Sequence, residues 1–506
     1  MYSIANRQYL IYLSAAIVSV LLSAWISGNE SVINPDAICY LQSAATMDEG
    51  LSAAMNVCGQ AKWPLYSLIV AGFVKLTALS YENAAYILNG LFSLLTVIAF
   101  VKITQILSYR LPEEKRIRLL WLAATVILLA NEFNSIKHYI VRDHGFWAFY
   151  LLSIVFLLNF TRSAKWYDAL LWSISMVIAT LFRIEGAVFL LMMPFIVWFD
   201  GNSTYLARTK KFLQLNNITI VAGLLVCIWL FLHPEMSAGR LNDLQFQLLH
   251  GMSKLVDNFQ LQADNLGKYV LSVHAVKDAS LILFCMLMTW YVVSIMINLS
   301  FIYSVLAVYA WRKKLIVVEK AMLKVLWWYL ILNLVFTLAF LFEYMFLSKR
   351  YLIALSLVCM LWVPFALDNL LQKWPQKKWA TIAAFTLIFI SSLGGIFEFG
   401  HSKKYIHDAG VWLDQHTPSN ATIYSNDNLV MYYSHRFGNT LFEKLQEFRE
   451  PSTIAQGKWK EYDYLALRVN KKATSNDQEI ISLIDRKPVM IFSNKRGDEV
   501  RIYQLN

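Results

Sequence analysis

Apolar runs of about 20 residues recur along the first four fifths of the chain, separated by short polar or charged segments. A run of this length crosses a hydrocarbon core of ~30 Å as a helix rising about 1.5 Å per residue. We therefore predict an all-α polytopic membrane bundle of about 11 transmembrane helices. The predicted spans are 9–27, 83–108, 119–133, 146–160, 167–183, 187–199, 215–232, 279–311, 321–343, 351–372 and 379–397.

Three segments depart from a simple span. Residues 64–80 are apolar but short and contain Lys75, so we interpret them as a juxtamembrane or partly inserted helix. Residues 279–311 are longer than one upright span needs, which predicts a tilted or kinked helix. In the polar stretch 233–278, the spacing of three leucines predicts an amphipathic helix lying on the bilayer or over the bundle. These leucines are Leu244, Leu248 and Leu249.

Basic residues indicate the orientation of the chain. Arg7 precedes the first span, and Arg110 begins a basic loop that follows the second. Cytoplasmic loops are enriched in Lys and Arg, so we expect a cytoplasmic N terminus and a first outside region over residues 28–82. Residues 9–27 are too long for a usual signal-peptide core and lack a clear small-residue cleavage site, so we interpret them as a retained span.

The pattern changes near residue 400, where long apolar runs give way to short strand-like runs. Strands are expected from Thr422 and over 464–467, 489–492 and 500–503, with a helix over 475–486. We therefore predict two domains: a transmembrane catalytic domain over residues 1–400, and a small extracytoplasmic α/β domain over residues 401–506.

The composition agrees with a membrane protein and argues against nucleic-acid binding. Of the 506 residues, 58% are hydrophobic and only 16% are charged, well below the charged share of a typical soluble protein. The 17 Trp and 26 Tyr suit interfacial belts. The formal charge of +11 comes from short loops and not from one patch, which favours positive-inside loops over a nucleic-acid surface.

The five cysteines show no metal-ligand spacing. Cys39 and Cys58 share the first outside region, where an oxidising compartment could pair them. Sequence separation does not fix the geometry that a disulfide needs, so the sequence leaves this pairing open.

Charged residues gather at the outer ends of the predicted spans. A charged group costs at least roughly 2.5–3.5 kcal/mol at the membrane centre, so those near membrane level usually face a cavity and mark function. We expect one cavity lined by Asp36, Lys62, Arg142, Asp143, Arg183, Glu185, Lys349 and Arg350.

Two carboxylates facing basic groups suit the transfer of a sugar from a lipid phosphate. The acceptor needs a base that removes its proton, and the departing phosphate needs cations. Asp36 and Asp143 supply carboxylates, while Lys62, Arg183 and Arg350 supply cations. Alternatively, both aspartates could bind a divalent metal, Mg²⁺ or Mn²⁺, which would stabilise the leaving phosphate. The sequence does not decide between these chemistries.

The ordered set of these motifs resembles the GT-C membrane glycosyltransferases. Asp36, followed by Lys62-Trp63-Pro64-Leu65-Tyr66, resembles the first-loop acid and the Lys-Pro-Pro-Leu type motif of the branch that holds the aminoarabinose transferase and the protein O-mannosyltransferases. The match covers about residues 1–400, and Trp63 stands where the motif usually has proline, which leaves the branch open. Three further matches are Arg142-Asp143-His144 to the second outside acid, Arg183-Ile184-Glu185-Gly186 to an Arg-Pro-Glu-Gly pattern, and Lys349-Arg350-Tyr351 to the Arg-Tyr that opens a late span.

The resemblance implies an inverting transferase at the outer face of a bacterial inner membrane. It would take a sugar from a polyprenyl-phosphate donor and place it on a glycan, lipid or protein acceptor. Asp36 would be the base, and Asp143 would assist it. The donor phosphate would contact Lys62, Arg142, Arg183, Arg350 and Tyr351, with Glu185 and His144 as supporting residues.

Simpler interpretations stay open for several of these residues. Asp36 follows Pro35 and could cap a short helix, while Arg183 could pair with Glu185. Asp143 could pair with Arg142, and His138 and His144 are typical of surface histidines.

Two other functional classes also stay open. A transporter or flippase of a lipid-linked or anionic solute would place its binding acids near the membrane centre and often shows inverted repeats. A catalytically silent relative would act as an assembly partner and would tolerate loss of both aspartates.

Overall fold

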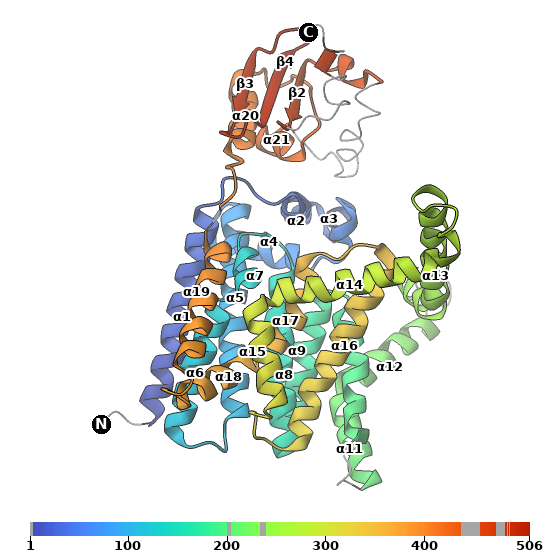
Figure 1. Cartoon of the computed structure of the whole chain (residues 1–506). Helices are drawn as coiled ribbons and strands as arrows, with labels where there is room; N and C mark the ends of the chain where they lie inside the picture. The colour runs from blue at the N-terminus through green and yellow to red at the C-terminus, as the bar shows by residue number, and fades with distance from the viewer. Residues whose placement is uncertain are drawn as a thin grey trace. The chain divides into compact units, whose positions relative to one another are not determined.

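The computed structural model describes residues 4–199, 204–232, 239–397, 399–436, 456–471, 481–482, 484 and 486–506, with the side chains of residues 4–5 and 225–252 excepted. It is mostly helical and carries a small mixed sheet near the C terminus (Figure 1). The chain divides into two compact units. Unit 1 contains Met1–Val20, Phe92–Ile136 and Asp143–Ile396, and unit 2 contains Leu21–Leu91, Lys137–Arg142 and Phe397–Asn506.

Within the described part of the chain, seven helical segments are long and apolar enough to cross a membrane. The protein is therefore a multi-pass membrane protein by its apolar helices. The segments are Asn6–Gly28 in α1 (Ile4–Gly28), α5 (Tyr81–Leu107), α8 (Asp143–Ser163), Val276–Leu299 ending in α14 (Ala279–Leu299), α16 (Lys320–Tyr344), Lys349–Gln372 and α19 (Lys378–Ile396).

Four of the predicted spans correspond to shorter helices, so the expected number of about 11 full spans is not confirmed. Polar or helix-breaking residues interrupt these apolar runs; Arg183 ends one of them, and Pro194 lies where a later helix tightens into a 3₁₀ turn. The four runs form α6 (Glu113–Leu128), α9 (Trp166–Phe182), α10 (Gly186–Met192) with the 3₁₀ helix η3 (Met193–Phe199), and α12 (Asn217–Leu232).

The three unusual segments of the sequence form helices. Residues 64–80 contain the 13-residue helix α4 (Leu65–Thr77), which confirms a short apolar helix. The long run 279–311 is broken at Ser300, whose φ of 63° separates α14 from α15 (Phe301–Arg312). The stretch 233–278 contains α13 (Gly239–Tyr269), while the side chains of its three predicted leucines, Leu244, Leu248 and Leu249, lie outside the described residues.

The middle of unit 1 is held together by hydrogen bonds between neutral side chains. The Tyr329 hydroxyl of α16 lies 2.8 Å from Ser153 Oγ of α8 and accepts from Trp172 Nε1 of α9 at 3.0 Å. Asn333 of α16 donates to the Tyr150 hydroxyl of α8. Such bonds hold membrane helices in register where the hydrophobic effect between helices is absent.

At one end of the same unit, Arg118 of α6 donates to the buried carboxylate of Asp368 at 2.5 Å, and Lys115 lies 3.6 Å from it. Asp368 belongs to α18 (Val363–Gln372), so this ion-pair group fastens α6 to α18. The remaining helices of unit 1 are α7 (Asn131–Ser135), α11 (Tyr205–Leu215), η4 (Val276–Asp278), η5 (Lys349–Leu352) and α17 (Ile353–Met360).

Unit 2 combines the first loop region with the C-terminal fold. The loop region contains α2 (Pro35–Ala45), η1 (Thr46–Glu49), α3 (Leu51–Met55), η2 (Gly59–Lys62) and α4. The C-terminal part contains α20 (Lys404–His416), α21 (Asn428–Tyr433), η6 (Lys458–Glu461) and four strands. α21 packs against both α20 and α2, and the Tyr433 hydroxyl accepts from the Ile33 backbone N–H at 2.9 Å.

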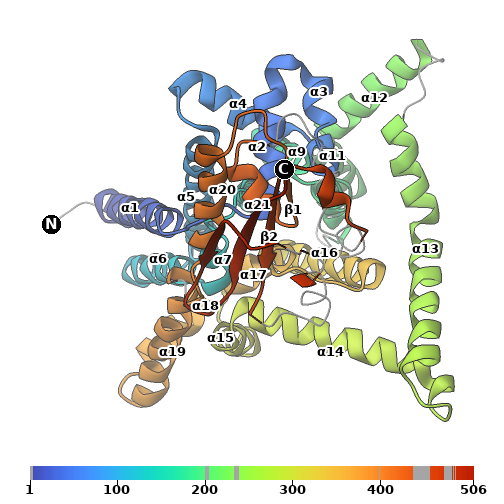
Figure 2. The ribbon, with the colours of Figure 1, turned by 90° about the horizontal axis from the view of Figure 1, so that it is seen from above.

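The sheet has the strand order β1-β2-β4-β3. β2, β4 and β3 are labelled in Figure 1, and β1 and β2 in Figure 2. β1 (Ile423–Ser425) is parallel to β2 (Tyr464–Val469), while β4 (Glu499–Gln504) runs antiparallel to β2 and to β3 (Met490–Ser493). Leu465, Leu467 and Val469 alternate along β2 into one core cluster, as the period of two requires. All four predicted strands are confirmed. Most of the predicted helix 475–486 lies outside the described residues, and the domain boundary near residue 400 stays a prediction.

Gly395 fixes how closely α19 approaches α7. A Cβ at this position would lie 2.2 Å from the Asn131 carbonyl oxygen. We expect Gly395→Ala to lower the free energy of unfolding by about 1–3 kcal/mol, because a backbone atom cannot move aside as a flexible side chain can. The thermal unfolding midpoint in detergent measures this loss. Gly72→Ala in α4 is the control, since its Cβ meets nothing within 4 Å; an equal loss in both variants would contradict the packing argument.

Candidate functional site

Arg183 is the centre of a buried charged cluster in unit 1. It lies between α9 and α10, is 7% exposed, and donates hydrogen bonds to the carboxylates of Asp143 and Glu185. Asp143 is the first residue of α8, and Glu185 directly precedes α10. One guanidinium therefore joins the ends of three helices, and the predicted pairing of Arg183 with Glu185 is confirmed.

Two glycines permit this convergence of helices. A Cβ at Gly145 would lie 2.4 Å from the Phe182 ring, and one at Gly186 would lie 2.7 Å from backbone atoms of Thr180. α8, α9 and α10 can therefore meet closely beside Arg183 only with glycine at these two places.

Arg350, another of the predicted cations, lies next to the cluster through Tyr351. The centre of the Tyr351 ring lies 4.6 Å from the guanidinium carbon of Arg183 and 5.4 Å from that of Arg350. Both distances lie within the range of cation–π attraction. The structure thus brings together five of the predicted site residues, namely Asp143, Arg183, Glu185, Arg350 and Tyr351.

The electrostatics of the cluster favour its charged forms. Burial alone would raise the pKa of the Glu185 carboxyl, but the Arg183 guanidinium outweighs this effect and holds that pKa below its usual range. Burial would lower the pKa of Arg183, yet its two carboxylate partners raise it well above the ordinary value. Both groups are therefore ionised at neutral pH.

A further ion pair in unit 1, between Lys349 and Glu132, was not predicted as a pair. Lys349 Nζ lies 2.9 Å from the carboxylate of Glu132, which is 5% exposed. Asn298 of α14 donates to the Lys349 carbonyl oxygen at 2.7 Å, so this segment is also held through its backbone. Glu132 was not predicted as a site residue because it follows an apolar run and belongs to none of the motifs.

His144 is buried, in contrast to the surface position that its residue type suggested. Its ring packs edge-on against Trp147, with ring centres 5.1 Å apart. His144 is the second residue of α8 and directly follows Asp143, so the first turn of this helix positions both residues. This placement is compatible with a supporting role.

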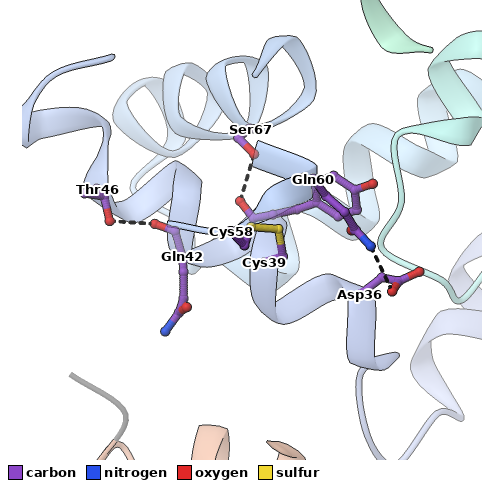
Figure 3. Close-up of a disulfide and its surroundings, with 8 residues drawn as sticks. Asp36, Cys39, Gln42, Thr46, Cys58, Gln60 and Ser67 are labelled. Atoms are coloured by element: carbon purple, nitrogen blue, oxygen red, sulfur yellow. Dashed lines mark hydrogen bonds between the residues drawn. A yellow bond between two sulfur atoms is a disulfide. The ribbon is translucent and has the colours of Figure 1, made fainter. Parts of the chain in front are cut away.

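Asp36 lies in unit 2, at the second position of α2 and after Pro35. The helix N-cap is Asn34, so Asp36 is not the capping residue. Residues 37–41 of the helix are buried, whereas Asp36 is half-buried. Gln60 Nε2 of η2 donates to Asp36 Oδ1 at 3.3 Å (Figure 3).

A disulfide fastens the two segments that carry this contact. Cys39 of α2 and Cys58, just before η2, are bonded, with their Cα atoms 6.0 Å apart (Figure 3). Ser67 of α4 donates to the Tyr40 carbonyl oxygen at 3.0 Å and ties α4 to the same helix. Lys62 is exposed at the end of η2, two residues after Gln60. The disulfide that the sequence left open therefore links the backbone segments of Asp36 and Lys62.

Residues 137–142, which contain the predicted Arg142, are anchored to this loop region. The Ile140 N–H donates to Asn34 Oδ1 at 2.7 Å, and Asn89 Nδ2 donates to the Tyr139 carbonyl oxygen at 2.9 Å. Arg142 is half-buried. In the same segment, burial lowers the pKa of Lys137 to about 7.

Breaking the disulfide should loosen this region. We expect Cys39→Ser to cost about 3 kcal/mol of local stability, because the bond closes a loop over a sequence separation of 19. Faster cleavage of residues 46–58 in limited proteolysis would report the loss, and Cys285→Ser, at an exposed free cysteine, is the control. Alkylation of both Cys39 and Cys58 in unreduced protein would contradict the bond.

A divalent metal does not fit the unit 1 cluster in this arrangement. Asp143 and Glu185 already share the positive charge of Arg183, which would repel a second cation. Throughout the described residues, no group of three or more His, Cys, Asp and Glu side chains is placed to hold a metal ion.

No family model and no curated protein matches the chain. The similar solved structures include the oligosaccharyltransferase of Archaeoglobus fulgidus in its apo form, with a TM-score of 0.47 and 10% identity over 81% of this chain and 58% of that one. They also include the oligosaccharyltransferase AglB of Archaeoglobus fulgidus in complex with an inhibitory peptide and a dolichol-phosphate. Its TM-score is 0.47, with 10% identity over 85% of this chain and 59% of that one. The chain thus spans less than two thirds of the length of these proteins.

Proposed function

We propose that the protein is a GT-C-type glycosyltransferase that moves a sugar from a polyprenyl-phosphate donor to an acceptor at the outer face of a bacterial inner membrane. The observation that carries this proposal is the setting of Asp36. Its carboxylate is half-buried at the start of a mostly buried helix, and it is held by Gln60 across a disulfide-closed loop. A carboxylate with a fixed position and access to solvent suits a general base.

In this proposal, Asp36 removes the proton from the acceptor hydroxyl or amine as that atom attacks the anomeric carbon of the donor. The bond from this carbon to the phosphate oxygen breaks, and the negative charge passes to the leaving phosphate. Lys62 and Arg142, which belong to the same unit as Asp36, stabilise that charge. Attack from the face opposite the phosphate inverts the configuration at the anomeric carbon.

For the unit 1 cluster we propose a role in binding the donor phosphate. Asp143 and Glu185 hold the Arg183 guanidinium in place. The N–H donors of a planar guanidinium match the oxygens of a phosphate well. Tyr351 places Arg350 beside it. Asp143 therefore assists by hydrogen bonding and not by binding a metal, and His144 supports the start of α8.

The disulfide also supports the orientation. Disulfides persist in oxidising compartments, so the loop that carries Asp36 belongs outside the cytoplasm. With the basic loops inside, the N terminus is then cytoplasmic and the C-terminal domain extracytoplasmic.

The deciding experiment is mass spectrometry of lipid and glycan extracts from cells that produce the wild type, Asp36→Asn or Asp48→Asn. Asp48 is the control because it is an exposed acid of the same loop region, paired with Lys75. A glycosylated product lost only in Asp36→Asn, with accumulation of the polyprenyl-phosphate sugar, would support the transferase and name its substrates. Unchanged glycoconjugates at equal protein level would contradict it, and flux of an unmodified solute in proteoliposomes would then favour the transporter.

A further inference from the structure

A polar cavity lies entirely within unit 1, at the end of α8 that is remote from Asp143. Its volume is about 470 Å³, and it is lined by parts of α5, α6, α8 and α9. Asp143 begins α8 and Arg162 lies in its last turn, so the helix alone separates the two by roughly 30 Å at 1.5 Å per residue. This distance is a full membrane thickness, so the cavity is distinct from the cluster around Asp143 and Arg183.

Four cationic side chains from four separate chain segments line this cavity, which we call the basic pocket: Lys102 of α5, Arg116 of α6, Arg162 of α8, and Lys165 before α9. The only carboxylate among the lining residues described is Asp168, which already accepts from Ser163 Oγ at 3.0 Å. Within the described chain, none of the four cations forms a direct ion pair with a carboxylate. At longer range Glu319, which accepts from the Tyr109 hydroxyl, attracts Arg162, and Asp168 attracts Lys165, so two carboxylates compensate only part of the four charges. Gathering like charges in this way is unfavourable unless an anion compensates them.

The contacts of these cations keep them in the pocket. Lys102 Nζ donates to Gln105 Oε1 at 2.8 Å, and the Arg162 guanidinium stacks at 5.3 Å from the centre of the Tyr109 ring. Arg116 Nε is a buried donor that has no hydrogen-bond partner among the described residues. An orphaned donor of this kind is costly, and a bound acceptor would satisfy it.

Positive-inside loops explain basic residues in general but not this arrangement. Nearby, Lys115 and Arg118 of the same helix α6 are neutralised by Asp368, so cations at this end of the bundle can be paired within the protein. The pocket cations instead converge with amide and hydroxyl groups of Gln105, Asn159 and Tyr167, and residues at the start of α9 also line the pocket. Guanidinium and ammonium groups together with neutral hydrogen-bond donors are usual partners of a phosphate.

We propose that the basic pocket binds a phosphate-bearing anion at the end of the unit 1 bundle remote from Asp143 and Arg183. The cavity volume suits a small polar group. The phosphate could belong to the headgroup of an anionic lipid in the adjacent leaflet or be free in solution, and the experiment separates these two sources.

The test uses the full-length protein in nanodiscs of phosphatidylglycerol and phosphatidylcholine, with bound lipid counted by native mass spectrometry. We expect the wild type to retain phosphatidylglycerol, and the pair Arg116→Gln with Arg162→Gln to weaken binding about tenfold or more through loss of two charge-assisted contacts. The matched control is Arg312→Gln with Lys313→Gln, which removes the same charge from exposed positions at the end of α15. Lys102→Gln with Lys165→Gln, both at exposed positions, is a second pocket variant in case the first does not fold.

Inorganic phosphate is then added as a competitor. Phosphatidylglycerol that stays bound identifies a lipid headgroup as the ligand, while its displacement, with phosphate binding lost only in the pocket variants, identifies a free phosphate. Either result supports the site. Equal binding of both probes by the wild type and the pocket variants, or an equal loss in the control, overturns it. A catalytically inactive protein that still binds would leave this proposal intact and contradict only the transferase.

Discussion

Asp36→Asn should lower the rate of sugar transfer by about 10²–10⁴-fold in the purified protein, because this is the usual contribution of a general base. The amide keeps the size of the side chain and can still contact Gln60, but it cannot take the acceptor proton. The rate is measured with the donor and acceptor that mass spectrometry identifies, at saturating donor. The fold should be unaffected, since Asp36 is half-buried and is not the helix cap.

Two variants separate catalysis from positioning. Gln60→Ala keeps the base but removes its hydrogen bond, so we expect a smaller loss of about tenfold, the size of one misplaced orienting contact. Asp48→Asn, at an exposed acid of the same region, should leave the rate unchanged. Transfer at the wild-type rate by Asp36→Asn would remove Asp36 from the role of base.

Arg183→Met should destabilise the protein by roughly 3–5 kcal/mol, the cost of breaking a buried ion pair from one side. The variant leaves Asp143 and Glu185 as two buried carboxylates with no shared counter-charge. The thermal unfolding midpoint in detergent and the folded fraction in gel filtration measure this loss. Arg183→Lys should not restore stability fully, because one ammonium cannot bridge both acids as a planar guanidinium does.

The matched control removes the stranded charges as well. In a triple variant with Arg183→Met, Asp143→Asn and Glu185→Gln, much of the lost stability should return, since neutral side chains cost less to bury than charges. Arg312→Met, at an exposed position, should have little effect. An Arg183→Met protein as stable as the wild type would show that the two carboxylates do not depend on this guanidinium.

The long, uninterrupted apolar spans were predictable from sequence because length and hydropathy alone specify a crossing helix. α5, α16 and α19 agree with the expected ranges to within one or two residues. The number of spans was overestimated because short apolar runs were counted as full crossings, as on either side of Arg183, where α9 has 17 residues and α10 has 7. Hydropathy locates the charged break between such runs, but it does not show whether a short apolar helix crosses the membrane.

The candidate site was predictable as a set of residues but not as a set of contacts. Charged residues at span ends identify Asp143, Arg183 and Glu185, yet only the packing of helices shows that Arg183 joins both acids. Gln60 was missed because it is neutral and lies 24 positions from Asp36. Burial of His144 follows from its neighbours in space, which its own residue type does not reveal.

The position of the disulfide has a consequence for biosynthesis. Both cysteines precede the second candidate span, α5, so the bond requires none of the later helices. It can close as soon as the segment reaches an oxidising compartment, while the ribosome is still making the rest of the chain. In cells that lack disulfide-forming oxidases, the chain would then insert normally but carry an unfastened first loop. The yield of active protein would then depend more on the oxidative capacity of the cell than on how much of the chain is inserted into the membrane.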